Sequence, residues 1–168
     1  MGSSAIDSGR LDPLELLAEW LTGVKLAHVG HARAAAIYAR RATALGVGAT
    51  IVSAAVGTTL FATLAASTDD RLIGAAALLS VIAVILSALQ TFLNYGELAV
   101  SHRVAAGAYG DLRRRVEQLL AFGRHDKLQR VMAEITEAWA KLDRDSPDLS
   151  PAMFDYARKW VSKRTASS

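Results

Sequence analysis

Two long uncharged runs dominate the hydrophobic pattern of this chain. Ala42–Thr68 and Leu72–Gly96 contain no Asp, Glu, Lys, Arg or His, and only residues 69–71 separate them. A helix needs about 20 apolar residues to cross a hydrocarbon core of about 30 Å, so each run is long enough to cross a membrane. The pattern therefore predicts a hairpin of two transmembrane helices, 42–68 and 72–96, joined by a tight external loop at 69–71.

Basic residues flank both runs on the side away from the loop. They are Lys25, Arg33, Arg40 and Arg41 before the first run, and Arg103, Arg113, Arg114 and Arg115 after the second. The loop itself, Asp69-Asp70-Arg71, carries a net negative charge. Because positive charge is enriched in cytoplasmic segments, this asymmetry predicts that both termini are cytoplasmic.

Outside the runs, apolar residues recur at alternating spacings of three and four. The series before the first run is Leu14, Leu17, Leu21, Val24, His28, His31, Ala35, Tyr38 and Ala42. The series after the second run is Leu98, His102, Ala105, Tyr109, Leu112, Val116 and Leu119. This heptad pattern is typical of packed helices. It predicts two cytoplasmic stem helices, 12–41 and 97–123, that pack antiparallel and continue without a break into the transmembrane helices.

The ends of these helices carry recognisable signals. Asp12 is expected to be the N-cap of the first helix, with Pro13 at its first position, and Gly123 to end the second stem helix. The Ser- and Gly-rich residues 1–11 are expected to be disordered. Residues 124–168 are predicted to form cytoplasmic C-terminal helices: an apolar face runs from Leu128 to Leu142, and a short helix follows the break at Ser150-Pro151.

The expected fold is all-α. It is an integral membrane helical hairpin of two transmembrane helices, continuous with a cytoplasmic antiparallel helical stem and followed by C-terminal helices.

Two similar segments lie at the ends of the stem helices nearest the membrane. In an antiparallel hairpin that turns at Asp70, His31 lies level with Tyr109 and Tyr38 with His102. The same register places Thr50 level with Gln90. Each His–Tyr pair is interpreted as a hydrogen-bonded contact between helices. A metal site is disfavoured because no Cys and no suitable carboxylate completes a ligand set.

Polar residues inside the two runs are the most informative candidates for function. The candidate pore-lining residues are Thr50, Ser53, Ser80, Ser87, Gln90, Thr91 and Asn94. Small and hydroxylated residues also let membrane helices pack closely, so helix packing is the alternative role for them. Amide side chains are costly to expose to lipid, so Gln90 and Asn94 are expected to face protein or water in either case.

Composition removes several classes of function. The net charge is only +3 and there is no aromatic–basic platform, so nucleic-acid binding is not expected. There is no cysteine, which excludes disulfides and thiolate metal sites. The transmembrane runs lack the ionisable residues that coupled transporters use. No phosphate loop, nucleophile elbow or paired carboxylate motif is present, so neither enzymatic activity nor a cofactor is expected.

Two basic clusters remain as candidate contacts for lipid or for a protein partner. They are Arg113, Arg114 and Arg115 on the second stem helix, and Arg158 and Lys159 in the C-terminal segment. Basic residues beside a membrane commonly anchor topology or bind anionic headgroups. A surface for an activating partner is the sharper alternative.

The order of these features resembles a known family. Trp20, His31 and Tyr38 precede the first run, Leu86-Ser87-Ala88-Leu89-Gln90-Thr91-Phe92 lies toward the end of the second, and His102 with Tyr109-Gly110-Asp111-Leu112 follows, then Trp139 and Ser146-Pro147. This arrangement around a short-looped hairpin resembles the SLATT family, the two-transmembrane effectors associated with SMODS nucleotide synthetases and SLOG nucleotide sensors. The resemblance covers residues 20–151.

The resemblance implies a prokaryotic conflict system and an inner-membrane location. It implies a membrane effector that forms pores and permeabilises the membrane when a nucleotide-linked signal arrives, with a nucleotide-signalling or sensor protein as a candidate partner. Because the two helices of one hairpin leave no lumen, such a pore requires a homo-oligomer, and its neutral hydroxyl and amide lining is expected to be weakly selective. No catalytic residue carries over. The alternative is a non-conducting membrane adaptor whose cytoplasmic helices recruit a partner.

Overall fold

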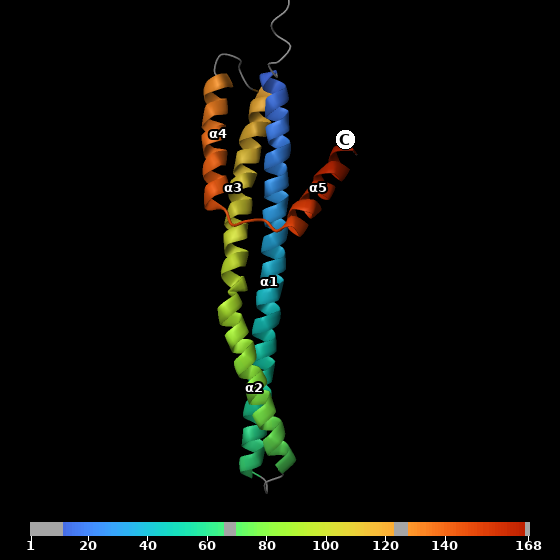
Figure 1. Ribbon diagram of the computed structural model, residues 1–168, viewed down its shortest axis with the longest axis vertical. Helices are drawn as coiled ribbons and strands as arrows, with labels where there is room; N and C mark the ends of the chain where they lie inside the picture. The colour runs from blue at the N-terminus through green and yellow to red at the C-terminus, as the bar shows by residue number, and fades with distance from the viewer. Residues whose placement is uncertain (1–11, 66–69, 123–127, 167–168) are drawn as a thin grey trace, which may run out of the picture. The chain divides into compact units, whose positions relative to one another are not determined.

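The computed structural model describes residues 12–65, 70–122 and 128–166, and these residues form helices without any strand. The helices are α1 (Pro13–Ala65), α2 (Asp70–Leu93), α3 (Tyr95–Phe122), α4 (Leu128–Asp145) and α5 (Pro151–Thr165) (Figure 1). The all-α prediction is confirmed. The predictions for residues 1–11 and for Asp69 and Gly123 lie outside the described residues.

The chain divides into two compact units. The first, termed the bundle unit, comprises Met1–Ala34 and Ser101–Ser168. It holds the beginning of α1, most of α3, and all of α4 and α5. The second, termed the hairpin unit, is Ala35–Val100 and holds the rest of α1, all of α2 and the first turn of α3.

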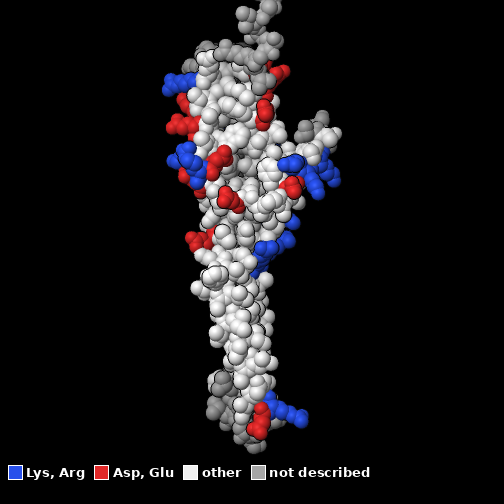
Figure 2. All heavy atoms as spheres, in the orientation of Figure 1, with Lys and Arg blue, Asp and Glu red and all other residues white. Residues whose placement is uncertain are grey.

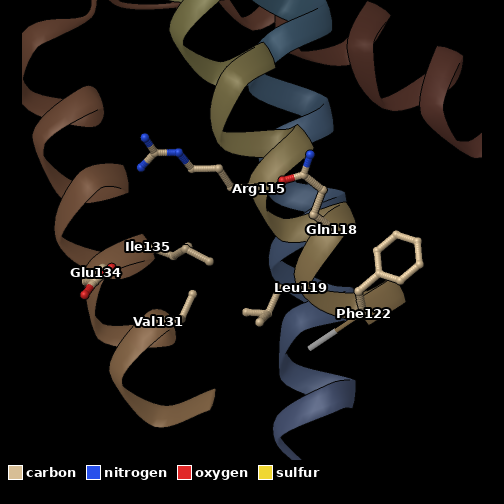
Figure 3. Close-up of a pocket in the computed structure, with 7 residues that line it drawn as sticks. All are labelled: Arg115, Gln118, Leu119, Phe122, Val131, Glu134 and Ile135. Atoms are coloured by element: carbon tan, nitrogen blue, oxygen red, sulfur yellow. The ribbon is translucent and has the colours of Figure 1, made fainter. Parts of the chain in front are cut away.

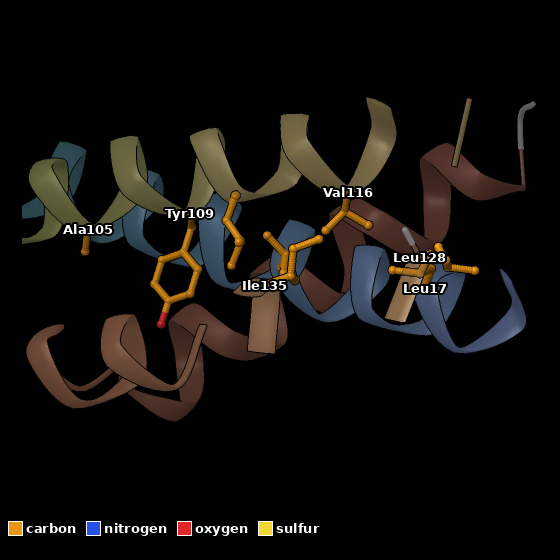
Figure 4. Packing of buried hydrophobic residues seen from close by; sticks show 8 residues of the cluster. Leu17, Ala105, Tyr109, Val116, Leu128 and Ile135 are labelled. Carbon is orange, nitrogen blue, oxygen red and sulfur yellow. The ribbon is translucent and has the colours of Figure 1, made fainter. Parts of the chain in front are cut away.

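The bundle unit has a core in which α1, α3 and α4 lie side by side (Figure 4). Leu17 and Val24 of α1 and Val116 of α3 are fully buried, and α4 contributes Leu128 and Ile135. The heptad pattern of the second stem helix is confirmed by burial, since Ala105, Tyr109 and Leu112 are also at most 5% exposed. Burial of these apolar residues is the main stabilising contribution to the unit.

The helix starts in this unit follow the local signals in the sequence. Asp12 caps α1, because its Oδ1 accepts the backbone N–H of Leu14 at 3.0 Å, which confirms the predicted N-cap. Helix α5 begins at Pro151, whose missing N–H costs nothing at a first helical position. Close packing also fixes a glycine on α1: a Cβ added at Gly23 would lie 2.7 Å from the Trp139 ring.

The hairpin unit has the opposite distribution of apolar residues. Helix α2 contains no buried residue. Large apolar side chains stand on its outside, with Val84 68% and Phe92 87% exposed, and Ile51 on α1 is 64% exposed. In Figure 2 the surface of this apolar stretch shows no blue or red atoms. Since water-soluble proteins rarely expose apolar patches this large, the surface is suited to lipid.

One prediction about the second apolar run was wrong. The run was expected to continue as one helix into the stem, but the chain breaks at Asn94, between α2 and α3. Asn94 has a positive φ of 40°, a conformation that Asn tolerates better than most residues. Its carbonyl then accepts the backbone N–H groups of Glu97 and Leu98, so that α3 starts as a new helix.

The predicted loop at 69–71 also needs correction. Asp70 and Arg71 belong to α2 rather than to a loop. Asp70 lies in the first turn of α2, where a negative charge stabilises the positive end of the helix dipole.

Candidate functional site

The hydroxyl groups among the pore-lining candidates are bonded within their own helices. Thr50 donates to the carbonyl of Gly46 at 2.9 Å, Ser80 to that of Ala76 at 2.8 Å, and Thr91 to that of Ser87 at 3.1 Å. Their protons are therefore satisfied without a partner helix or water. These residues can face lipid at little cost, so a hydroxyl on a span does not by itself indicate a pore.

Some of these candidates share a surface on α2. Ser87 and Thr91 line an open groove together with Ala83, Val84 and Phe92. Ser53 is exposed on α1, and Ser80 is half-buried near the middle of α2. The single chain thus brings Ser87 and Thr91 together on one face.

Of the two amide candidates, Gln90 lies in the last turn of α2 and Asn94 lies between α2 and α3. Both are exposed, and both line a small cavity with Ala42, Leu45 and Tyr95. The Nε2 atom of Gln90 lies 3.8 Å from the position that a Cβ at Gly46 would take. Gly46 lies one helical turn before Thr50, which is the residue that the predicted register places level with Gln90. The side-chain amide of Asn94 donates a hydrogen bond to the Glu97 carboxylate.

A cation–aromatic cluster beside this cavity was missed by sequence reasoning. The rings of Tyr38 and Tyr95 stack at 5.8 Å, and the Arg41 guanidinium lies over both, at 5.9 Å and 5.6 Å. The signal that could have found it is a tyrosine just before the first apolar run and another near the end of the second, with Arg41 directly before the first run.

The bundle unit contains a buried polar network that joins three helices. His31 on α1 and His102 on α3 are 3% and 2% exposed, and their Nδ1 atoms are 2.9 Å apart. The His31 ring also stacks on Tyr109 at 5.3 Å. The Tyr109 hydroxyl in turn donates to Asp143 Oδ1 of α4 at 2.6 Å. The structure thus brings the predicted partners His31 and Tyr109 together, but as a ring stack and not as the predicted hydrogen bond, because each side chain bonds to another residue.

The geometry of this network restricts its protonation. Two nitrogens in one hydrogen bond share one proton, so His31 and His102 cannot both be charged without losing that bond. Burial, followed by the neighbouring His102, lowers the pKa of His31 from 6.5 to about 4. Burial also lowers the pKa of His102 and, with Asp143, raises the pKa of Tyr109 to about 12. The network is therefore neutral at its centre at pH 7.

Sequence reasoning missed two polar contacts of the bundle unit, one made by His28 and one by Asp143 of the network. His28 donates through Nδ1 to the carbonyl of Ala106 at 2.8 Å, a bond across helices that no sequence pattern indicates. The Tyr109–Asp143 bond joins residues from separate helices, and Asp143 carries no local signal. Among residues 12–65, 70–122 and 128–166, no group of three or more potential ligands is placed to hold a metal ion.

The basic candidates have different surroundings. Arg113 pairs with Glu117 at 3.5 Å, and Arg114 pairs with Asp111, so both are engaged on their own helix. Arg115 lies at an open groove between α3 and α4 (Figure 3). Its apolar lining consists of Leu119, Phe122, Val131 and Ile135.

The two basic candidates on α5 also differ from each other. The Arg158 guanidinium lies over the Phe154 ring at 5.1 Å, whereas Lys159 is exposed. Lys and Arg gather over this helix in Figure 2.

The fold and these features define a helical membrane protein. In the part of the chain that the structure describes, two helices are long and apolar enough to cross a membrane, and no residue in the most apolar stretch of either is buried. Residues 14–145 match the SMODS and SLOG-associating 2TM effector domain family 4, and the chain belongs to that family. It is thus a two-transmembrane effector of conflict systems. Comparisons with curated proteins and with solved structures found no match.

Proposed function

We propose that the protein is a membrane effector of a prokaryotic anti-phage system that assembles into a weakly selective, homo-oligomeric pore. When a nucleotide-linked signal arrives, the pore depolarises or permeabilises the inner membrane. Both termini are cytoplasmic in this proposal, and the protein does no chemistry on a substrate. Membership of a family of two-transmembrane effectors supports the effector role.

The observation that supports the oligomeric pore is the exposed amide of Gln90 on α2. None of its residues is buried in the single chain, yet Gln90 is exposed there with its amide group. An amide in lipid lacks the partners that water or protein supplies. Assembly of several copies would cover this amide or line a water-filled path with it. A lining of neutral amides and hydroxyls would discriminate weakly between ions.

The test is leakage from liposomes that contain the purified protein at increasing protein-to-lipid ratios. Leakage is expected to rise cooperatively with protein and to fall in Gln90→Leu. The matched control is Gln118→Leu, the same substitution on α3 in the bundle unit, which should leak like the wild type. Equal leakage from Gln90→Leu and the wild type, at equal incorporation, would remove Gln90 from the pathway.

Asn94 requires a different pair of variants because its backbone has a positive φ. Asn94→Leu changes the side chain and also strains the backbone, whereas Asn94→Gly removes the amide and tolerates that conformation. Loss of leakage in both variants assigns the effect to the amide. Loss in Asn94→Leu alone assigns it to the break between α2 and α3.

The groove beside Arg115 favours a second candidate function, a non-conducting adaptor. An apolar floor with a charged rim is suited to a partner helix. In that case Arg115→Glu abolishes the cellular effect, while Gln90→Leu retains it. The pore proposal predicts the opposite result in the leakage assay, where Gln90→Leu lowers leakage and Arg115→Glu does not.

A further inference from the structure

A cavity in the bundle unit is lined by residues from four helices and from the segment that connects α4 to α5. Its volume is about 380 Å³, within the range of small-molecule sites. Its lining includes aromatic side chains from three different helices, Tyr109, Trp139 and Phe154. The polar network described above forms one wall, since His31 and Asp143 also line it.

The charged side chains that line this cavity are acidic. Asp143 and Asp148 both line the cavity, and none of the described residues that line it is a Lys or Arg. His31 adds no positive charge at pH 7, because burial lowers its pKa to about 4. Asp143 already accepts one hydrogen bond from Tyr109, but a carboxylate has further lone pairs to offer. An anionic ligand would be repelled here, and a cation would be attracted.

The aromatic rings that line the cavity are a second reason to expect a cation as the ligand. The face of an aromatic ring attracts a cation, and aromatic rings around a quaternary ammonium group are a recurrent recognition site. The Phe154 ring shows this property in the structure, since the Arg158 guanidinium lies 5.1 Å from its centroid. Trp139 is held edge-on to Trp20 at 6.4 Å, so its ring has a fixed orientation.

We propose that this cavity binds a small organic cation of the quaternary ammonium class, with the ammonium group among Trp139, Phe154 and Tyr109 and its charge opposite Asp143 and Asp148. Such a ligand contacts α1, α3, α4, the connecting segment and the start of α5 at once. It therefore holds the connecting segment and α5 against the other three helices. The site does not depend on the pore function proposed above.

The binding test compares choline with 3,3-dimethylbutan-1-ol, which has the same shape with carbon in place of the charged nitrogen. Titration calorimetry on the full chain in dodecyl maltoside, a detergent without an ammonium group, measures both at constant ionic strength. Choline is expected to bind at least tenfold more tightly. Equal affinity for the two compounds, or no choline binding, overturns the proposal.

Variants locate the site. Asp148→Asn is expected to weaken choline binding about threefold to tenfold without changing the affinity for the alcohol. Asp145→Asn is the matched control, because it makes the same charge change three residues earlier and Asp145 does not line the cavity. Phe154→Leu keeps an apolar wall and should also weaken choline binding. Equal loss in Asp148→Asn and Asp145→Asn would indicate nonspecific attraction to net charge and would overturn the site.

The same quaternary ammonium could reach the cavity free or as part of a lipid headgroup. Soluble glycerophosphocholine distinguishes these sources, since it carries the same group beside a phosphate. If glycerophosphocholine binds as tightly as choline, the ligand is a lipid headgroup. Binding of choline with rejection of glycerophosphocholine identifies a free cation, because the phosphate then meets the carboxylate of Asp148.

Discussion

The buried histidine pair makes the stability of the bundle unit depend on pH in a defined window. In the folded state the pKa of His31 is about 4, mainly because of burial and then because of the neighbouring His102, with Asp143 acting in the opposite direction. In the unfolded chain His31 has an ordinary pKa of 6.5. Below pH 6.5 the unfolded state therefore binds a proton that the folded state refuses. Stability falls as the pH falls from about 6.5 to about 4, and His31 contributes no further change below that.

The size of the effect follows from the two pKa values. One pH unit corresponds to about 1.4 kcal/mol, so the difference between 6.5 and about 4 corresponds to about 3 kcal/mol of lost stability. This is a large share of the stability of a typical domain, about 5–15 kcal/mol. The hydrogen bond between the two Nδ1 atoms is lost when both rings are protonated, so it also favours the neutral form of His31 in the folded state.

The assay is urea unfolding of the full chain in detergent between pH 7.5 and pH 4, followed by tryptophan fluorescence. Trp20 and Trp139 pack against the core of the bundle unit and so report its unfolding. The comparison variant is His31→Gln, which keeps hydrogen-bonding groups but cannot titrate. Carboxylates titrate in both proteins below about pH 5, so the informative quantity is the difference between their pH slopes.

The wild type is expected to lose about 3 kcal/mol more than His31→Gln over this range. If His31→Gln does not fold, the titration of the His31 ring by NMR in the wild type measures its pKa directly. Parallel pH slopes for the two proteins, or an NMR pKa near 6.5, would show that burial does not keep the His31 ring neutral.

Two further predictions concern packing and hydrogen bonding in the same unit. Gly23→Ala places a methyl group 2.7 Å from the rigid Trp139 ring and should cost about 1–3 kcal/mol, whereas Gly107→Ala has open space and should stabilise by up to about 1 kcal/mol. Urea midpoints that shift in the same direction for both would contradict this packing. Tyr109→Phe removes the hydroxyl bonded to Asp143 and should cost about 1–2 kcal/mol. An unchanged midpoint would show that water replaces that bond fully.

Much of the fold was predictable because its main signals are long and periodic. The uncharged runs are long enough to predict membrane-spanning helices whatever the helix propensity of single residues in them. Apolar residues of these runs, such as Ile51 and Phe92, are exposed in the structure, on a surface suited to lipid where charged residues would be costly. The heptad series predicted the helices of the bundle unit because burial repeats with the turn of a helix. Leu17, Val24 and Val116 occupy such positions and are fully buried.

The break at Asn94 was missed because the hydrophobic pattern passes through it unchanged. Apolar periodicity reports which face of a helix is buried and carries no information about a single residue with positive φ. The local signal was present in a different form. Asn94 is followed three residues later by Glu97, and an Asn-x-x-Glu sequence is a typical helix start. A second helix start inside a predicted helix is therefore a sign of a break when Asn occupies the first position.

The candidate site was predictable only in part, and the reason differs between hydroxyl and amide residues. A sequence shows that a polar residue lies in a membrane span, but not where its proton goes. In the structure Thr50, Ser80 and Thr91 donate to their own helices, so they place no demand on a neighbouring chain. The amide of Gln90 has two donors and an acceptor that one backbone carbonyl cannot satisfy. The demand for assembly or water therefore falls on the amides, and for this reason Gln90→Leu separates a pore from helix packing more sharply than any hydroxyl substitution does.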